Sequence, residues 1–142
     1  RVIAVEDLYA GPGRSRVDSS QSIVTGIYIP WQAGRISAFK RLARRRALAL
    51  PVLNIALAIL LEEGVIKKIS VAAGPVGPQP LRLREVEAVL QGREVTPDII
   101  DEAARVAAAV ARPRDSVLRG SREYRRELLG VLVRRILIEA TA

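Results

Sequence analysis

A short basic stretch, residues 37–46, holds the side chains of this sequence best suited to binding chemistry. It contains the chain's lone phenylalanine, Phe39, and one of its three lysines, Lys40. It also contains four arginines, Arg41, Arg44, Arg45 and Arg46. Clustered cations of this kind bind anionic groups, whether phosphates or carboxylates. No aromatic residue is interleaved among the arginines, which favours an ion-pair cluster or a contact with another subunit over a nucleic-acid stripe.

The sequence excludes several kinds of catalysis because it contains neither cysteine nor histidine. Thiolate chemistry, disulfides, Cys/His zinc sites, an iron–sulfur cluster held by this chain and a Ser-His-Asp triad are all ruled out. Glu85 and Glu87 lie two apart on a predicted helix and so do not face each other. We therefore assign no catalytic residue and no metal ligand.

The net charge of +8 keeps a basic nucleic-acid-binding domain as an alternative function. The basic residues are mostly arginine, however, and they are spread from Arg1 to Arg135. This distribution favours a solvated basic surface with an acidic partner. Arginine dominance without cysteine or methionine also fits a GC-rich or thermophilic source.

The elements that would position the basic stretch are strands. Residues 52–61 and 65–73 are apolar runs separated by Glu62-Glu63-Gly64, which predicts a β-hairpin. Residues 37–50 show a helical period that ends at Pro51. A hairpin needs a further partner strand, and this requirement favours a strand over residues 36–46. Another strand is predicted over residues 23–29, where β-branched residues precede Pro30.

Helical signals follow the strands. A short helix is expected over residues 83–90, and Thr96-Pro97-Asp98 is a strong start for a second that ends near Arg112. Ser121 caps a third, from Arg122 to about Ala140. Strands followed by helices indicate an α+β fold. We expect an antiparallel sheet of three or four strands, covered on one face by about three helices as a sandwich.

Three separated motifs resemble the C-terminal domain of carbon monoxide dehydrogenase flavoproteins, which also closes the FAD segment of xanthine dehydrogenases. They are Ser37-Ala38-Phe39-Lys40 with Leu42-Ala43-Arg44-Arg45, the stretch from Gly74 to Arg82 before the helix with Glu85 and Glu87, and the tail from Asp115 to Arg126 followed by Leu132–Arg135. The resemblance covers essentially the whole chain. It implies that residues 1–35 are the carboxyl-terminal remnant of an FAD-binding domain and that residues 36–142 form the C-terminal domain.

The resemblance also implies a partial cofactor site. Lys40 matches a family lysine that contacts the flavin, where a fixed cation would favour the anionic reduced ring. Val24 matches an apolar residue packed near the flavin; otherwise it would be an ordinary core valine. The glycine-rich loops that hold the FAD pyrophosphate in this family are absent from these residues. We therefore expect the chain alone to bind no FAD and to be inactive.

The implied activity is electron transfer in a molybdenum hydroxylase. The family oxidises substrates at a molybdopterin subunit, and electrons pass through the [2Fe-2S] clusters of a small subunit to FAD. The expected partners are therefore the N-terminal FAD-binding portion, the iron–sulfur small subunit and the molybdenum large subunit. No apolar stretch is long enough to span a membrane. A cytoplasmic location is expected.

Overall fold

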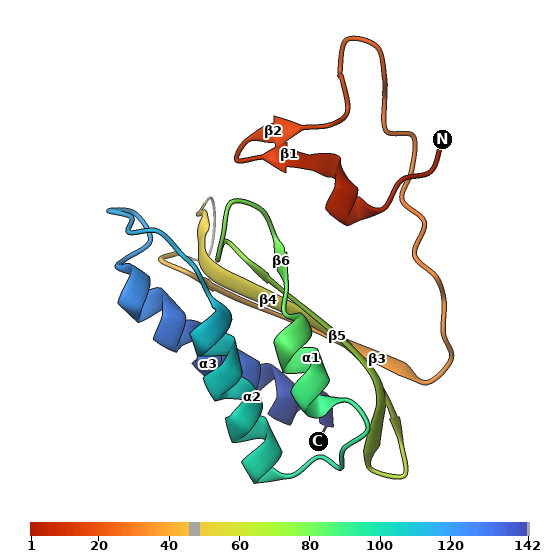
Figure 1. Cartoon of the computed structure of the whole chain (residues 1–142), viewed down its shortest axis with the longest axis vertical. Helices are drawn as coiled ribbons and strands as arrows, with labels where there is room; N and C mark the ends of the chain where they lie inside the picture. Colours follow the sequence, from red (N-terminus) through yellow and green to blue (C-terminus); the bar gives the residue numbers. More distant parts are fainter. Residues whose placement is uncertain (46–48, 142) are drawn as a thin grey trace. The chain divides into compact units, whose positions relative to one another are not determined.

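A computed structural model of the chain describes residues 1–45 and 49–141. The chain separates into two compact units, Arg1–Ala33 and Gly34–Ala142, shown with all elements in Figure 1. Each unit is described by itself. The assignment of residues 1–35 to an FAD-binding domain stays a prediction.

The N-terminal unit contains little regular structure. A 3₁₀ helix, η1 (Val5–Leu8), leads into a small hairpin of β1 (Tyr9–Gly11) and β2 (Arg14–Ser15). Gly13 at the turn has a φ of 68°, a left-handed conformation that glycine adopts without strain. All residues from 1 to 33 are described, and none of them is buried.

The strand predicted over residues 23–29 is absent from this chain. Residues 22–32 form neither helix nor strand, although their sequence is rich in β-branched residues. A strand exists only through hydrogen bonds to a neighbouring strand, and no described segment pairs with this one. The predicted strand is therefore wrong for this chain, because it has no partner strand here.

The C-terminal unit is built on a four-stranded antiparallel sheet. Its strands are β3 (Arg35–Ala43), β4 (Pro51–Glu62), β5 (Val65–Gly74) and β6 (Leu81–Arg82), in the order β3-β4-β5-β6. This confirms the predicted meander, with a short fourth strand added. The predicted end of the first strand, Arg46, lies outside the described residues.

The strand conformation of β3 overrides its helical sequence period. β3 pairs with β4 over its whole length, from Arg35 opposite Leu60 to Ala43 opposite Pro51. This ladder, with one irregularity between Leu42 and Ala43, satisfies the backbone groups on one side of the strand, which outweighs a weak local preference. The β4–β5 turn is tight, with positive φ values at Glu63 and Gly64 (52° and 77°) as short hairpins require.

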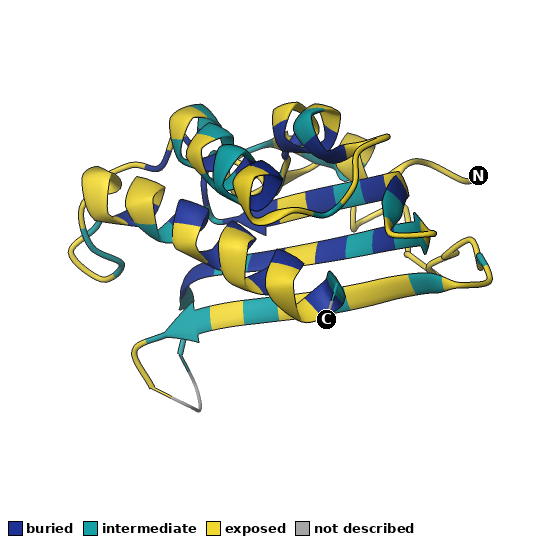
Figure 2. Cartoon of the chain, turned by 90° about the horizontal axis from the view of Figure 1, so that it is seen from below, coloured by how far each residue is buried: buried dark blue, intermediate teal, exposed yellow. Residues whose placement is uncertain are grey.

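Three helices cover one face of this sheet, as Figure 2 shows: α1 (Arg84–Leu90), α2 (Pro97–Val110) and α3 (Arg122–Thr141). The predicted start of α2 is confirmed, because the Thr96 hydroxyl accepts a hydrogen bond from the Ile99 amide at 3.3 Å and Pro97 occupies the first turn. None of the helices in the described parts of the chain has the length and apolarity needed to cross a membrane.

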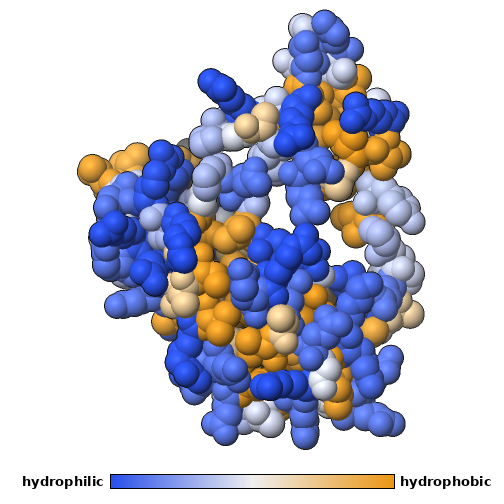
Figure 3. All heavy atoms as spheres, viewed as in Figure 1, coloured by the Kyte–Doolittle hydropathy of each residue, from blue (hydrophilic) through white to orange (hydrophobic). Residues whose placement is uncertain are grey.

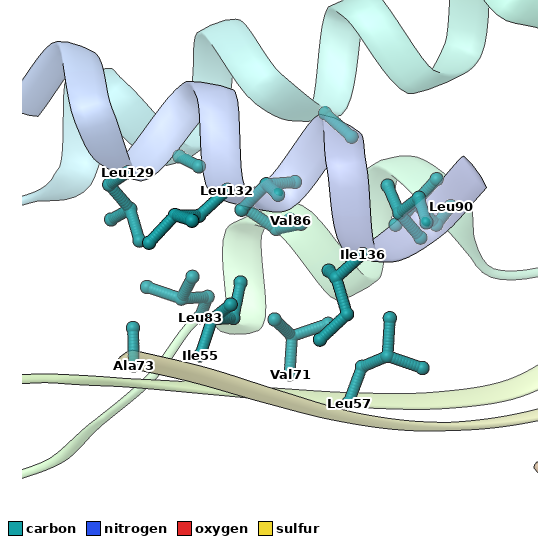
Figure 4. Packing of buried hydrophobic residues seen from close by; sticks show 14 of the residues in the cluster. Ile55, Leu57, Val71, Ala73, Leu83, Val86, Leu90, Leu129, Leu132 and Ile136 are labelled. Atoms are coloured by element: carbon teal, nitrogen blue, oxygen red, sulfur yellow. The ribbon is translucent and has the colours of Figure 1, made fainter. Parts of the chain in front are cut away.

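The core lies between the sheet and the helices. Figure 4 shows side chains of β4 and β5 beneath those of α1 and α3; the labelled residues are Ile55, Leu57, Val71, Ala73, Leu83, Val86, Leu90, Leu129, Leu132 and Ile136. Each of these side chains is buried. α2 and α3 approach closely at Gly130, where an added Cβ would lie 2.9 Å from the carbonyl oxygen of Ala104. This contact explains a glycine inside a helix.

Candidate functional site

The two faces of β3 differ in what they contact. Ala38 and Leu42 are partly buried on the side that faces the helices, and Lys40 shares that side. Ser37, Phe39 and Arg41 point to the other side and are exposed. Because β3 is an edge strand, groups on both of its faces can reach a molecule that approaches the edge.

Lys40 forms an ion pair with Glu139 near the end of α3, through Nζ and Oε2. Its side chain is 26% exposed and that of Glu139 is 58% exposed. The ammonium group is therefore held at the surface of the unit, close to a carboxylate that offsets its charge. A partly exposed pair of this kind is held weakly, by at most about 1 kcal/mol. Lys40 can thus exchange this partner for another anion.

Glu139, the ion-pair partner of Lys40, is a candidate site residue that the sequence did not reveal. It lies 99 positions after Lys40, on a different kind of element. No spacing or motif connects two residues so far apart. Only the packing of α3 against β3 brings them together.

Phe39 was noted in the basic stretch but was not predicted as a cofactor-binding residue. Its ring is 61% exposed on the open face of the sheet, next to Lys40 in sequence. An exposed aromatic ring can stack on another planar ring. One signal in the sequence could have indicated this exposure. In a strand over residues 36–46, Phe39 lies on the face opposite Ala38 and Leu42.

Val24 lies in the N-terminal unit and is 60% exposed. It is therefore not a core residue of that unit. Lys40 belongs to the C-terminal unit, so the two predicted cofactor-binding residues are described separately. The flavin contact predicted for each stays a prediction.

The arginines that follow Lys40 bind backbone carbonyl groups. Arg41 donates to the carbonyl oxygen of Ala49, and Arg44 donates to that of Val117 at 3.1 Å. Arg41, Ala43, Arg44 and Arg45 line a shallow surface hollow of about 310 Å³. The bonds to Ala49 and Val117 tie the end of β3 to the start of β4 and to the loop between α2 and α3. Arg46 lies outside the described residues.

The two glutamates of α1 have different environments. Glu87 is buried, and its Oε1 accepts hydrogen bonds from the Val71 amide (2.8 Å) and from Arg82 Nε (2.6 Å). Glu85 is exposed. Glu87 thus completes the hydrogen bonding of β5 beyond the short β6, which is a structural role.

Arg125 joins three segments of the C-terminal unit from a buried position. It is 3% exposed and donates to the carbonyl oxygens of Arg114, at 2.9 Å, and Pro75. Burial, and then the nearby charge of Arg119, lower the pKa of the Arg125 guanidinium from its ordinary value. Carbonyl dipoles, rather than a carboxylate, stabilise this cation.

The geometry defines a small α+β sandwich domain with a lysine and an aromatic ring on its free edge strand. Residues 37–140 match the CO dehydrogenase flavoprotein C-terminal domain, and the chain belongs to this family. The family and the fold predicted from the sequence are both confirmed.

Relatives and solved structures agree with this family. The chain is 34% identical to the glyceraldehyde dehydrogenase medium chain of Sulfolobus acidocaldarius, over 93% of this chain and 46% of the relative. It is 30% identical to the nicotine 6-hydroxylase medium subunit of Paenarthrobacter nicotinovorans, over 100% of this chain and 49% of that relative. In structure it is similar to reconstituted CO dehydrogenase from Oligotropha carboxidovorans, with a TM-score of 0.89 and 27% sequence identity. The match covers 99% of this chain and 49% of that one.

The chain spans about half the length of the curated relatives it matches, at 46% and 49%. Both relatives are oxidoreductase subunits by name. Neither these relatives nor the family supports the nucleic-acid-binding alternative.

Proposed function

We propose that the chain is the C-terminal portion of the FAD-binding subunit of a molybdenum hydroxylase of the carbon monoxide, xanthine or aldehyde dehydrogenase type, and that it helps to position FAD. The observation that carries the proposal is the family match over residues 37–140, together with the structural similarity to a CO dehydrogenase over 99% of the chain. The partners would be an N-terminal FAD-binding portion, an iron–sulfur small subunit and a molybdenum large subunit. The location would be the cytoplasm.

The chemistry of β3 suits the ring end of FAD. Phe39 presents an exposed apolar ring, and Lys40 presents a cation at the same strand edge. The pyrophosphate end would need several backbone amides converging on an anion. The glycine-rich loops that supply such amides in this family are absent from the 142 residues. The residues here therefore fit part of the cofactor.

Within this partial site each residue would have its own role. Lys40 would stabilise negative charge on the reduced ring, and Glu139 would hold and partly neutralise that lysine. Phe39 would stack against the ring. For Val24, which belongs to the N-terminal unit, a flavin contact is proposed separately. FAD, when bound, supplies the redox chemistry and receives the electrons from the iron–sulfur subunit.

Cofactor binding tests the proposal. The purified 142-residue chain should be folded and colourless, and inactive as an oxidoreductase, because most of the binding energy for FAD lies in pyrophosphate contacts. Supplying the N-terminal FAD-binding portion should give a complex with stoichiometric FAD, measured by its visible absorbance. Stoichiometric FAD on the 142 residues alone would contradict the partial site. A reconstituted complex without FAD would contradict the function itself.

Lys40→Ala tests the role of the cation in the reconstituted flavoprotein. Loss of a positive charge near the ring should lower the flavin reduction potential while the circular dichroism spectrum stays unchanged. Lys67→Ala is the matched control, because Lys67 is an exposed lysine on β5 of the same sheet. An unchanged potential in Lys40→Ala, or an equal shift in the control, would remove Lys40 from the site.

A further inference from the structure

The sheet of the C-terminal unit has one covered face and one open face. The helices cover one side (Figure 2), and no helix or strand described in this unit lies on the other. Large exposed apolar side chains are concentrated in the N-terminal unit, where Figure 3 shows them at the surface. The open face of the sheet differs from them, because most of its side chains are small or basic.

Small side chains form one row across the open face. Ser37 of β3 lies opposite Ala58 of β4, and Ala58 lies opposite Ser70 of β5. In the next row, Arg35 and Lys68 lie on either side of β4 and point to the same face. Ala58 carries only a methyl group, so a long side chain from β3 can lie across β4 and reach β5.

Arg35 makes this crossing and reaches a hydroxyl group. Its Nη2 donates to Ser70 Oγ at 3.2 Å. Its Nε is buried and bonds no described atom, and among the described residues no carboxylate pairs with this guanidinium. Arg35 is also half-buried, and a cation partly removed from water is stabilised by an anion. The guanidinium of Arg35 therefore keeps an uncompensated positive charge.

A second guanidinium binds the same hydroxyl group. Arg82 Nη2 donates to Ser70 Oγ at 3.0 Å, while Nε and Nη2 of Arg82 also bind the carboxylate of Glu87 at 2.6 and 3.0 Å. A hydroxyl oxygen has two acceptor positions and one proton. Both acceptor positions of Ser70 are filled by guanidinium groups, and its proton has no acceptor among the described residues. The hydroxyl can therefore donate to an acceptor that approaches from solvent.

The charges around Ser70 favour a doubly charged anion. Arg35, Arg82 and Lys68 are cations, and Glu87 offsets the charge of Arg82. Lys68 lies two residues before Ser70 on the same face, roughly 7 Å along the strand. These four charged side chains have an excess of two positive charges. A phosphate group carries close to two negative charges at neutral pH.

We propose that Arg35, Ser70 and Arg82 form a binding site for a phosphate group on the open face of the sheet. The phosphate oxygens accept hydrogen bonds from the Ser70 hydroxyl and from the terminal nitrogens of the two arginines, and Lys68 adds electrostatic attraction. The flat row beside Ala58 leaves room for the rest of a molecule that carries the phosphate. None of these residues belongs to the proposed flavin contacts, so the site does not depend on bound FAD.

Isothermal titration calorimetry with inorganic phosphate tests the site. At constant ionic strength, held with chloride, the 142-residue chain should bind one phosphate per chain in a saturable manner. Acetate has a single charge and should bind about tenfold more weakly, because it forms fewer charge-assisted hydrogen bonds. Phosphate binding that does not saturate, or acetate binding as tight as that of phosphate, would overturn the site.

Matched variants test the assigned residues. Arg35→Gln should weaken phosphate binding by about tenfold, because it removes a charged donor. Arg93→Gln changes the net charge equally, but Arg93 pairs with Glu102 of α2, so it should leave the affinity unchanged. An equal loss of affinity in both variants would overturn the site, because net charge alone would then attract phosphate.

A serine pair tests the hydroxyl group. Ser70→Ala should weaken phosphate binding by about tenfold, because it removes the donor between the two guanidinium groups. Ser37→Ala in the same row should have no effect. Both variants should keep the circular dichroism spectrum of the unsubstituted chain. Full phosphate affinity in Ser70→Ala would overturn the assigned geometry.

Backbone amide chemical shifts locate the bound phosphate. The changes should be concentrated at residues 35, 70 and 82. Changes concentrated at residues 41–45 would overturn the site, because phosphate would then bind in the arginine hollow at the end of β3.

Adenosine monophosphate distinguishes the sources of the phosphate group. Binding that shifts the same amides and is tighter than that of inorganic phosphate would identify a nucleotide-type phosphate ester, whereas weaker binding would identify free phosphate. The complete FAD-binding subunit should bind inorganic phosphate as tightly as the 142-residue chain. Loss of phosphate binding in the complete subunit would overturn the site, because the open face would then be an interface within the subunit.

Discussion

The same residue type meets opposite environments in the two units of this chain. Ile55, Ile59 and Ile136 in the C-terminal unit are completely buried, whereas Ile23, Ile27 and Ile29 in the N-terminal unit are 77% to 84% exposed. Hydrophobicity is equal in the two sets, so it cannot explain the difference. What differs is the presence of neighbouring elements that cover the side chains.

The C-terminal unit supplies its own cover because its elements follow one another along the chain. β3, β4 and β5 are consecutive antiparallel neighbours, and the helices that follow return to one face of their sheet. The N-terminal unit contains one small hairpin and a long extended segment. We therefore expect residues 34–141 to fold autonomously and residues 1–33 to contribute little to stability in isolation.

The largest contrast is expected from isoleucine truncations. Ile136→Ala removes a fully buried side chain and should lower the free energy of unfolding by about 2–5 kcal/mol, because a cavity remains. Ile138→Ala in the same helix, 51% exposed, and Ile27→Ala in the N-terminal unit should each change it by less than about 0.5 kcal/mol. Urea unfolding measures all three. A large loss of unfolding free energy in Ile27→Ala would show that Ile27 is buried in a core and would contradict the contrast.

Arg125→Ala should have the next largest effect. It leaves the carbonyl groups of Pro75 and Arg114 without their donor, at a cost of about 1–3 kcal/mol in the free energy of unfolding. Arg126→Ala is the matched control, because the neighbouring Arg126 is exposed and bonds one carbonyl, that of Ala108. Equal thermal and urea stability in the two variants would contradict the role of Arg125 as a link between segments.

Gly→Ala substitutions compare the packing of the two units directly. Gly130→Ala should destabilise the chain by about 1 kcal/mol, since the clash with Ala104 exceeds the gain in helix propensity. Gly26→Ala meets no atom within 4 Å and should change stability by less than about 0.5 kcal/mol. Comparable losses from both substitutions would mean that the region around Gly26 is as closely packed as the α2–α3 contact.

The smallest effect on stability is expected at the ion pair. Glu139→Gln should lower the free energy of unfolding by less than about 1 kcal/mol, because the pair is partly exposed. In the reconstituted flavoprotein it should raise the flavin reduction potential, opposite in sign to Lys40→Ala, since the lysine charge is no longer offset. A shift in the same direction as Lys40→Ala would show that Glu139 does not act through Lys40.

The sequence predicted the C-terminal unit well where local signals and pairing requirements agreed. Thr96 and Pro97 marked the start of α2 because capping chemistry depends only on adjacent residues. β3 was predicted against its own helical period, because the hairpin of β4 and β5 required a further strand. Pairing logic was thus more informative there than local propensity.

The sequence was less informative where the answer depends on distant or missing groups. The strand expected over residues 23–29 had the right composition, but composition does not supply a partner. Lys40 was predicted as a cofactor-binding residue through the family resemblance, whereas its ion-pair partner Glu139 lies 99 residues away and carries no local signal. The exposure of Phe39 likewise follows from the pleat and position of β3 in the folded sheet.

The position of β3 at the edge of its sheet has a consequence for solubility. One side of this strand pairs with β4, and among the described residues no strand pairs with its other side. Such an edge invites identical molecules to add their own strands and grow into fibrils. Arg35 and Arg41 lie along β3 on a protein whose net charge is +8, so two copies approaching edge to edge would repel each other. High salt would screen this repulsion, so we expect the basic stretch that suits an anionic partner also to disfavour self-association of the protein at low salt.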